Sequence, residues 1–158
     1  MIESLRYCQQ HKGLHIVGYV IMSNHIHMVV YTEGYALSDV LRDFKKFTAT
    51  QILKSIETEP ESRREWLLYL FKFYAKHKTD NRQHPFWQQD NHPITLWTLE
   101  VIWQKLTYIH LNPVRAGIVE VAWEYLYSSA RDYYKNQKGF LDVEIAEPLG
   151  PIRPTGYY

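Results

Sequence analysis

Two neighbouring apolar runs near the N-terminus limit most strongly what this chain can fold into. Residues 14–22 and 25–31 are rich in Val, Ile and Tyr, and Ser23 and Asn24 stand at the join between them. This pattern predicts two strands connected by a tight turn, which are expected to pair in an antiparallel sheet.

The second run begins with two histidines that are one residue apart. Because side chains alternate between the faces of a strand, His25 and His27 are expected on one face, and Ile26 and Met28 on the other. Two neutral imidazoles at this spacing can share one metal ion. A His-X-His pattern is short and arises by chance, so taken alone it favours two surface histidines on a half-exposed strand.

The segments on either side of the strands are predicted to be helical. Residues 2–12 have apolar side chains on one helical face, and Gly13 stands at the expected stop. A second helix is expected from Leu37, with Ser38 as its N-cap. The stripe predicted to be buried in it holds Val40, Leu41, Phe44, Phe47 and Ile52.

The other side of this second helix is basic, with Arg42, Lys45 and Lys46 in its first half. A solvated charged face is the default explanation for these cations. Phe44 and Phe47 stand directly beside the lysines, however, and aromatic residues mixed with positive charge also suit contact with a phosphate backbone.

A third helix is expected over residues 61–77, with Pro60 at its start. Residues 76–85 then read as a polar loop, and 86–94 as an extended segment in which His92 precedes a proline. His92 alone carries little weight. The buried stripe predicted for the third helix holds Trp66, Leu67, Leu70, Phe71 and Tyr74.

A fourth helix is predicted from Thr98, as N-cap, to about Leu111, where Pro113 stops it. His110 lies within the apolar stripe of this helix and is expected to be a core or boundary histidine. The other members of that stripe are Leu99, Ile102, Trp103, Leu106 and Ile109.

Tyr108 falls roughly opposite that stripe. Asn112, four residues later, shares its face, and Lys105 is near both. From periodicity alone, a surface tyrosine lying on a neighbouring loop explains this placement better than catalysis does.

Composition favours one soluble α+β domain over residues 1–146, followed by a Pro/Gly-rich tail over 147–158. The chain has 158 residues and a net charge of +1, so any nucleic-acid surface must be a local concentration of Lys and Arg. Cys8 is the single cysteine, which excludes an internal disulfide and fits a reducing cytoplasm. No run has the length of a membrane span.

Two stretches together resemble the REP-associated tyrosine transposases, which belong to the single-tyrosine HUH transposases. Residues 22–27, Met-Ser-Asn-His-Ile-His, are similar to one signature of this family, and residues 108–117, Tyr-Ile-His-Leu-Asn-Pro-Val-Arg-Ala-Gly, to another. Phe-Trp-Gln at 86–88, His-Pro-Ile at 92–94 and Tyr-Ser-Ser-Ala at 127–130 also look like family positions. The similarity therefore spans almost the whole chain.

The resemblance implies an HUH nuclease fold, ferredoxin-like or RRM-like, with helices packed on an antiparallel sheet. It implies His25, His27 and Asn112 as ligands of Mg²⁺ or Mn²⁺, and Tyr108 as a nucleophile that forms a 5′-phosphotyrosine. The implied substrate is single-stranded DNA with a hairpin, often a palindromic repeat, with Arg42, Lys45, Lys46, Lys105 and Arg115 as candidate DNA contacts.

This sequence begins at the first helix, whereas family members place a strand before it. If the given sequence is complete, the sheet is expected to lack one member and to leave an edge exposed. A truncated sequence or a misplaced start is the preferred explanation. Whether the protein acts as a monomer or a homodimer is left open.

The chemistry of the matched residues fits this activity. A phenol holds its proton up to about pH 10, and a metal ion or Lys105 nearby would favour the phenolate. A divalent ion polarises a phosphodiester and offsets the developing charge. Imidazole ligands suit Mn²⁺ better than Mg²⁺.

Other functions remain open. A histidine-triad nucleotide hydrolase would need a third alternating histidine, and the next position on that face is Val29. Two-histidine phosphoesterases would need a paired His-X-Thr. A DNA-binding protein that keeps the hairpin-binding surface but not the chemistry is the main non-enzymatic alternative.

Overall fold

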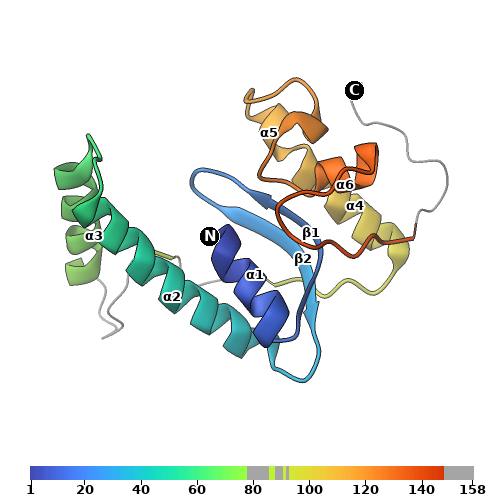
Figure 1. The fold of residues 1–158 in the computed structure, drawn as a ribbon, viewed down its shortest axis with the longest axis horizontal. Helices are drawn as coiled ribbons and strands as arrows, with labels where there is room; N and C mark the ends of the chain where they lie inside the picture. Colours follow the sequence, from blue (N-terminus) through green and yellow to red (C-terminus); the bar gives the residue numbers. More distant parts are fainter. Residues whose placement is uncertain (78–85, 88–90, 92, 148–158) are drawn as a thin grey trace.

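The hairpin forms the centre of the molecule (Figure 1). The computed structural model describes residues 1–77, 86–87, 91 and 93–147. Strands β1 (Leu14–Ile21) and β2 (Ile26–Thr32) pair in antiparallel register, with an irregularity between Ile16 and Gly18. The α+β class and both strands are confirmed, with bounds that differ from the predicted ones by one residue. The predicted tail lies almost wholly outside the described residues, as do His92 and 78–85 of the predicted loop.

The edge of β1 opposite β2 is covered by residues from the C-terminal part of the chain. The Ile21 amide donates to the Tyr127 carbonyl at 2.8 Å, and the Ser129 amide donates to the Tyr19 carbonyl at 3.0 Å. Further along, the Glu144 amide donates to the Ile16 carbonyl at 2.9 Å. These bonds satisfy backbone groups of β1 and fix the C-terminal segments against the sheet.

Helices α1 (Ile2–His11) and α2 (Leu37–Thr58) cover one face of the hairpin, as Figure 1 shows. Gly13 follows α1 with φ of +55°, a left-handed conformation that suits glycine, so the predicted stop is confirmed. The core on this face contains Leu5, Cys8, Leu14, Ile16, Tyr19, Val40, Phe44 and Leu141.

Helix α4 (Leu99–His110) covers the opposite face, and the Thr98 side chain caps it by accepting from the Val101 amide, as predicted. The helix lies so close to β1 that a Cβ added at Gly18 would overlap the Leu106 side chain. The short helices α5 (Asn112–Arg115), η1 (Ala122–Glu124) and α6 (Ala130–Lys135) follow. The core here contains Val20, Val29, Leu106, Ile109 and Tyr133.

The far half of α2 and helix α3 (Arg64–His77) extend away from the sheet as a helical hairpin (Figure 1). Phe86 and Trp87 pack at this hairpin, where the Trp87 indole N–H donates to Thr48 Oγ1 at 3.0 Å. The Phe86 ring lies 5.6 Å from that of Phe71. This part of the predicted extended segment is therefore attached to both helices.

Several expectations for these helices were wrong. Ala36, not Ser38, is the N-cap of α2, because the Asp39 and Val40 amides already donate to the Ala36 carbonyl. Helix α3 begins at Arg64 rather than soon after Pro60, because the Glu61 carboxylate accepts the Arg63 amide in a separate turn.

Three side chains that were predicted to be buried are exposed. Phe47 and Trp66 have exposed fractions of 55% and 57%, and Leu99, in the first turn of α4, has 41%. In α2, Thr48 and Ala49 take the inward positions instead. Helical periodicity marks an apolar face, but it does not show whether another element covers that face.

Candidate functional site

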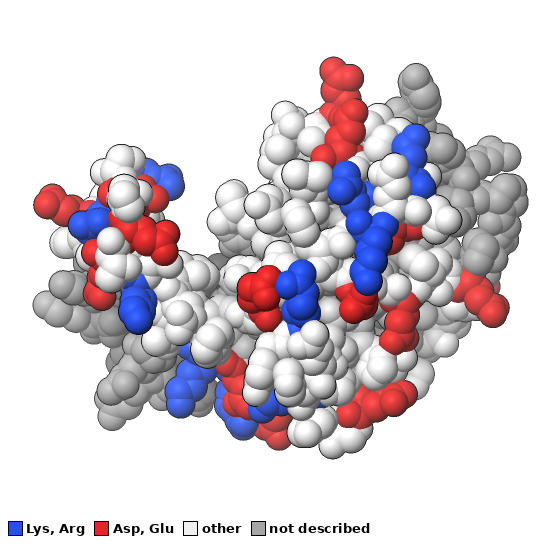
Figure 2. Space-filling model, viewed as in Figure 1, with Lys and Arg blue, Asp and Glu red and all other residues white. Residues whose placement is uncertain are grey.

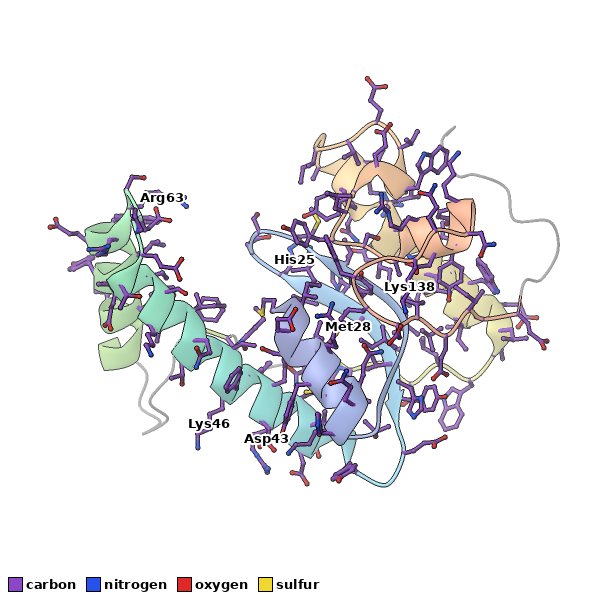
Figure 3. The ribbon with its side chains drawn as sticks, viewed as in Figure 1. His25, Met28, Asp43, Lys46, Arg63 and Lys138 are labelled. Atoms are coloured by element: carbon purple, nitrogen blue, oxygen red, sulfur yellow. The ribbon has the colours of Figure 1, made fainter. Side chains whose placement is uncertain are left out.

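The two histidines stand at the end of the hairpin (Figure 3). His27 lies in β2, whereas His25 lies in the turn just before the strand, so the prediction of both residues within the strand was wrong by one position. Their ring centroids are 4.9 Å apart and both residues are half-buried. Ile26 and Met28 pack on the α1/α2 side, so the predicted alternation of faces is confirmed.

Helix α4 brings Tyr108 to this pair. Leu106 and Ile109 are buried against the sheet, which turns Tyr108 outward with an exposed fraction of 46%. The Tyr108 ring centroid lies 5.7 Å from that of His27, in an edge-to-face arrangement. The two stretches that carry the family signatures therefore meet in space, although about eighty residues separate them in the sequence.

Asn112 occupies the first turn of α5, directly after the helix that carries Tyr108. Its Nδ2 donates to the Tyr108 carbonyl at 3.1 Å and to the Ile109 carbonyl at 3.4 Å. These bonds use the N–H groups of the amide and leave Oδ1 as an oxygen that can coordinate a cation.

The histidine pair also has the protonation chemistry that a metal ligand requires. His25 Nδ1 lies 2.7 Å from Asn24 Oδ1, an acceptor, so Nδ1 carries the proton and Nε2 keeps a free lone pair. Burial of the ring, and then the nearby His25, lower the pKa of His27 below its usual value. The neutral form of His27, which has a lone pair to donate, is therefore favoured.

The atoms that these residues could offer a divalent cation are two imidazole nitrogens and one amide oxygen. The described part of the chain holds no cluster of three His, Cys, Asp or Glu side chains suited to a metal ion. A set of two imidazoles and one amide oxygen would leave coordination positions for phosphate oxygens, and imidazole ligands suit Mn²⁺ better than Mg²⁺.

The candidate DNA-contacting cations are dispersed. Arg115 lies over the Tyr108 ring, with its Cζ 5.3 Å from the ring centroid. Lys105 is half-buried on α4. Lys45 lies 5.9 Å from the Trp87 ring on α2, and Lys46 points outward from that helix, away from His25 (Figure 3).

Arg42 is held by acidic neighbours on its own helix, because its guanidinium pairs with Asp39 at 2.7 Å and Asp43 at 3.1 Å. Figure 2 shows basic side chains interspersed with acidic ones on this face. The candidate cations divide between α2, which carries Arg42, Lys45 and Lys46, and the α4–α5 segment, which carries Lys105 and Arg115.

Two positions near the site carry structural roles. His110 is fully buried, with Nε2 2.8 Å from Ser129 Oγ, which confirms it as a core histidine. Val29 belongs to the core cluster beneath α4. The position where a histidine-triad hydrolase would need its third imidazole is thus filled by an apolar core residue.

Comparison with known proteins identifies the family. The family model for IS200-like transposases matches residues 1–83, which is more than half of the chain. The chain belongs to the IS200-like transposases. The matched part of this transposase contains His25 and His27 and ends before Tyr108 and Asn112. No curated protein and no solved structure gives a significant match to it.

Two features of the candidate site were not predicted from the sequence. Asn24 was interpreted only as a turn residue, although an Asn directly before a histidine pair is a signal for an orienting hydrogen bond. Arg115 was predicted to contact DNA. Its position over the Tyr108 ring depends on the turn after α4, so the spacing of the two residues in the sequence does not predict it. Among the described residues, no helix has the length and apolar character needed to cross a membrane.

Proposed function

We propose that this transposase is a metal-dependent single-strand DNA endonuclease and strand transferase of the REP-associated type. Tyr108 acts as nucleophile, and His25, His27 and Asn112 hold Mn²⁺ or Mg²⁺. The observation that carries the proposal is the 5.7 Å separation between the Tyr108 and His27 rings, which puts a half-exposed phenol beside a metal-competent pair.

The chemistry is a phosphoryl transfer. The Tyr108 hydroxyl oxygen attacks a backbone phosphorus, the bond from that phosphorus to the 3′ oxygen breaks, and a 5′-phosphotyrosine forms. The phenol loses its proton to solvent, and the departing 3′ oxygen gains one. A 3′ hydroxyl of another strand end reverses the step and rejoins DNA. The bound cation would supply charge stabilisation for the phosphate oxygens.

The remaining residues of the chain position these groups. Asn24 fixes the ring of His25 through Nδ1, and the bonds from Asn112 to the α4 carbonyls orient its amide. Arg42, Lys45, Lys46, Lys105 and Arg115 are proposed as contacts for the DNA backbone, each acting locally because the net charge of the chain is only +1.

The test is a covalent adduct assay. The protein is incubated with Mn²⁺ or Mg²⁺ and end-labelled single-stranded DNA that carries a hairpin, and the products are separated on a denaturing gel. We expect a protein-DNA adduct from wild type and none from Tyr108→Phe. Tyr127→Phe is a matched control, because Tyr127 has an exposed fraction of 48% against 46% for Tyr108.

Two outcomes would overturn the proposal. An adduct that persists in Tyr108→Phe would assign the nucleophile elsewhere. Hairpin binding without any adduct in wild type, with either metal, would favour the alternative of a DNA-binding protein without chemistry. A competition series with hairpin-free DNA of equal length tests the preference for hairpin substrates.

A further inference from the structure

Arg115 has a more specific relation to Tyr108 than the other candidate cations. Its guanidinium lies over the Tyr108 ring, with Cζ 5.3 Å from the ring centroid. We propose that Arg115 is a positioning residue that holds the Tyr108 ring beside His27 in the orientation for attack. This inference rests on the proposed function, because it assumes that Tyr108 is the nucleophile.

Tyr108 needs such a partner because its environment leaves the ring partly free. Its exposed fraction is 46%, and the ring neighbours found among the described residues are His27 and Arg115. A cation over an aromatic face is a modest attraction even at an exposed site. That is enough to favour one ring orientation several-fold over another, while the backbone of α4 sets only where the side chain begins.

The backbone that carries Arg115 is itself fixed relative to α4. Pro113 of α5 is fully buried, and the Arg115 amide donates to the Leu111 carbonyl at 2.9 Å. Gly117 closes the turn with φ of +66°, and its amide donates to the Val114 carbonyl at 2.9 Å. Arg115 and Tyr108 are therefore presented by one rigid helix-turn unit.

The guanidinium also keeps its hydrogen-bond donors available. No ion pair between Arg115 and an acidic side chain is found within the residues that the structure describes, whereas Asp39 and Asp43 bind Arg42. Guanidinium N–H groups point outward in the plane of the group, so its face can cover a ring while its edge binds phosphate oxygens. One side chain can therefore orient the nucleophile and also contact the phosphate that it attacks.

The first test separates positioning from simple DNA affinity. Adduct formation is followed in single-turnover reactions over a range of hairpin DNA concentrations with wild type, Arg115→Met and Arg115→Lys. We expect Arg115→Met to lower the maximal rate several-fold, because the Tyr108 ring loses the contact that favours its orientation for attack. The maximal rate of Arg115→Lys is expected to lie between those of wild type and Arg115→Met, since a lysine keeps the charge but not the planar guanidinium.

Arg63→Met provides the control for loss of an exposed arginine. Arg63 stands at the turn between α2 and α3, away from His25 in Figure 3, and pairs with Glu61. Its loss is expected to leave the maximal rate within about twofold of wild type, in keeping with the weak energetics of surface ion pairs.

The second test does not depend on activity. Tyr108 is replaced by 3-fluorotyrosine, and its ¹⁹F resonance is compared in the wild-type and Arg115→Met backgrounds, with circular dichroism as a check on folding. A shifted and narrowed resonance in the folded Arg115→Met protein is expected, because the ring loses its stacked partner.

The outcomes are distinguishable. No adduct from wild type overturns the proposed function. An adduct from wild type with an unchanged maximal rate in Arg115→Met, or a change confined to the half-saturating DNA concentration, overturns the positioning role alone. So does an unchanged ¹⁹F resonance. If Arg115→Met fails to fold, Arg115→Lys takes its place in both tests. An unchanged maximal rate or an unchanged ¹⁹F resonance in Arg115→Lys then overturns the positioning role.

Discussion

Nε2 of His110 lies 2.8 Å from Oγ of Ser129, and both residues are fully buried between α4 and the edge of β1. The Ser129 hydroxyl also accepts the Tyr19 amide at 2.9 Å. This pair therefore connects the helix that carries Tyr108 to the strand next to the histidines. Burial lowers the pKa of His110 to about 3, so the imidazole is neutral in the folded protein.

The His110 pair predicts a loss of stability in acid. In the unfolded chain this histidine takes up a proton below about pH 6.5, whereas the folded protein resists protonation until about pH 3. The free energy of unfolding should therefore fall as pH drops through that window, by at most about 1.4 kcal/mol per pH unit from this group. Urea unfolding at pH 7, 6, 5 and 4.5 measures the slope.

The control for that measurement is His110→Gln, which cannot titrate. We expect it to be less stable than wild type at pH 7, because a core side chain is altered, but to show a shallower decline toward pH 4.5. Parallel slopes in the two proteins would mean that His110 does not contribute to acid sensitivity.

Gly18→Ala should separate α4 from the sheet. The added Cβ would overlap Leu106 Cδ2, which belongs to the core beneath α4. Overpacking of this kind costs about 1–3 kcal/mol. Because Tyr108 lies on the same helix, adduct formation should also fall. Leu106→Ala makes room for the methyl group, so the double variant should be more stable than the sum of the single effects, as judged by urea unfolding.

Asn24→Ala should weaken metal binding without unfolding the protein. The change removes Asn24 Oδ1, which accepts a hydrogen bond from His25 Nδ1 at 2.7 Å. Loss of such an orienting partner lowers metal affinity about 10- to 100-fold. Calorimetric titration with Mn²⁺ checks this, and Ser23→Ala in the same turn serves as the control. Equal affinities in Asn24→Ala and wild type would mean that Asn24 does not orient a ligand.

The Trp87 contact predicts a measurable coupling between the 86–87 segment and α2. The indole N–H donates to Thr48 Oγ1 at 3.0 Å, and the ring lies 6.0 Å from that of Phe44. Trp87→Phe and Thr48→Val each remove one partner of the hydrogen bond. A double-mutant cycle on the free energy of unfolding should give a coupling of about 1 kcal/mol. Strictly additive effects would show that the bond contributes nothing.

The faces on which the histidines and Tyr108 stand followed from two simple periodicities, whereas the meeting of Tyr108 with the histidines was implied only by the family resemblance. Alternation along β2 put the histidines opposite Ile26 and Met28, and helical spacing turned Tyr108 away from the stripe of Leu106 and Ile109. The buried state of His110 followed from the same stripe. These predictions succeeded because every element involved packs directly on the sheet.

The features that were predicted wrongly or missed share one physical cause. Each depends on the surroundings of a helix and not on the sequence pattern within it. Phe47 and Trp66 lie on apolar helical faces, yet α2 and α3 leave the sheet and nothing in the described structure covers those side chains. The place of Arg115 over Tyr108 depends on the turn after α4, and the start of α3 depends on a carboxylate that accepts one amide. Such three-dimensional details have no periodic signature.

The alternation of β2 has a consequence for how this protein can lose its activity during evolution. A one-residue insertion or deletion in the strand would exchange its two sides, so that His27 would enter the apolar core under α1 and Met28 would face Tyr108. This exchange of faces would destabilise the fold and also remove the histidine from the candidate site. Descendants that become inactive but still fold should therefore carry point replacements at these positions, with the spacing of the strand intact.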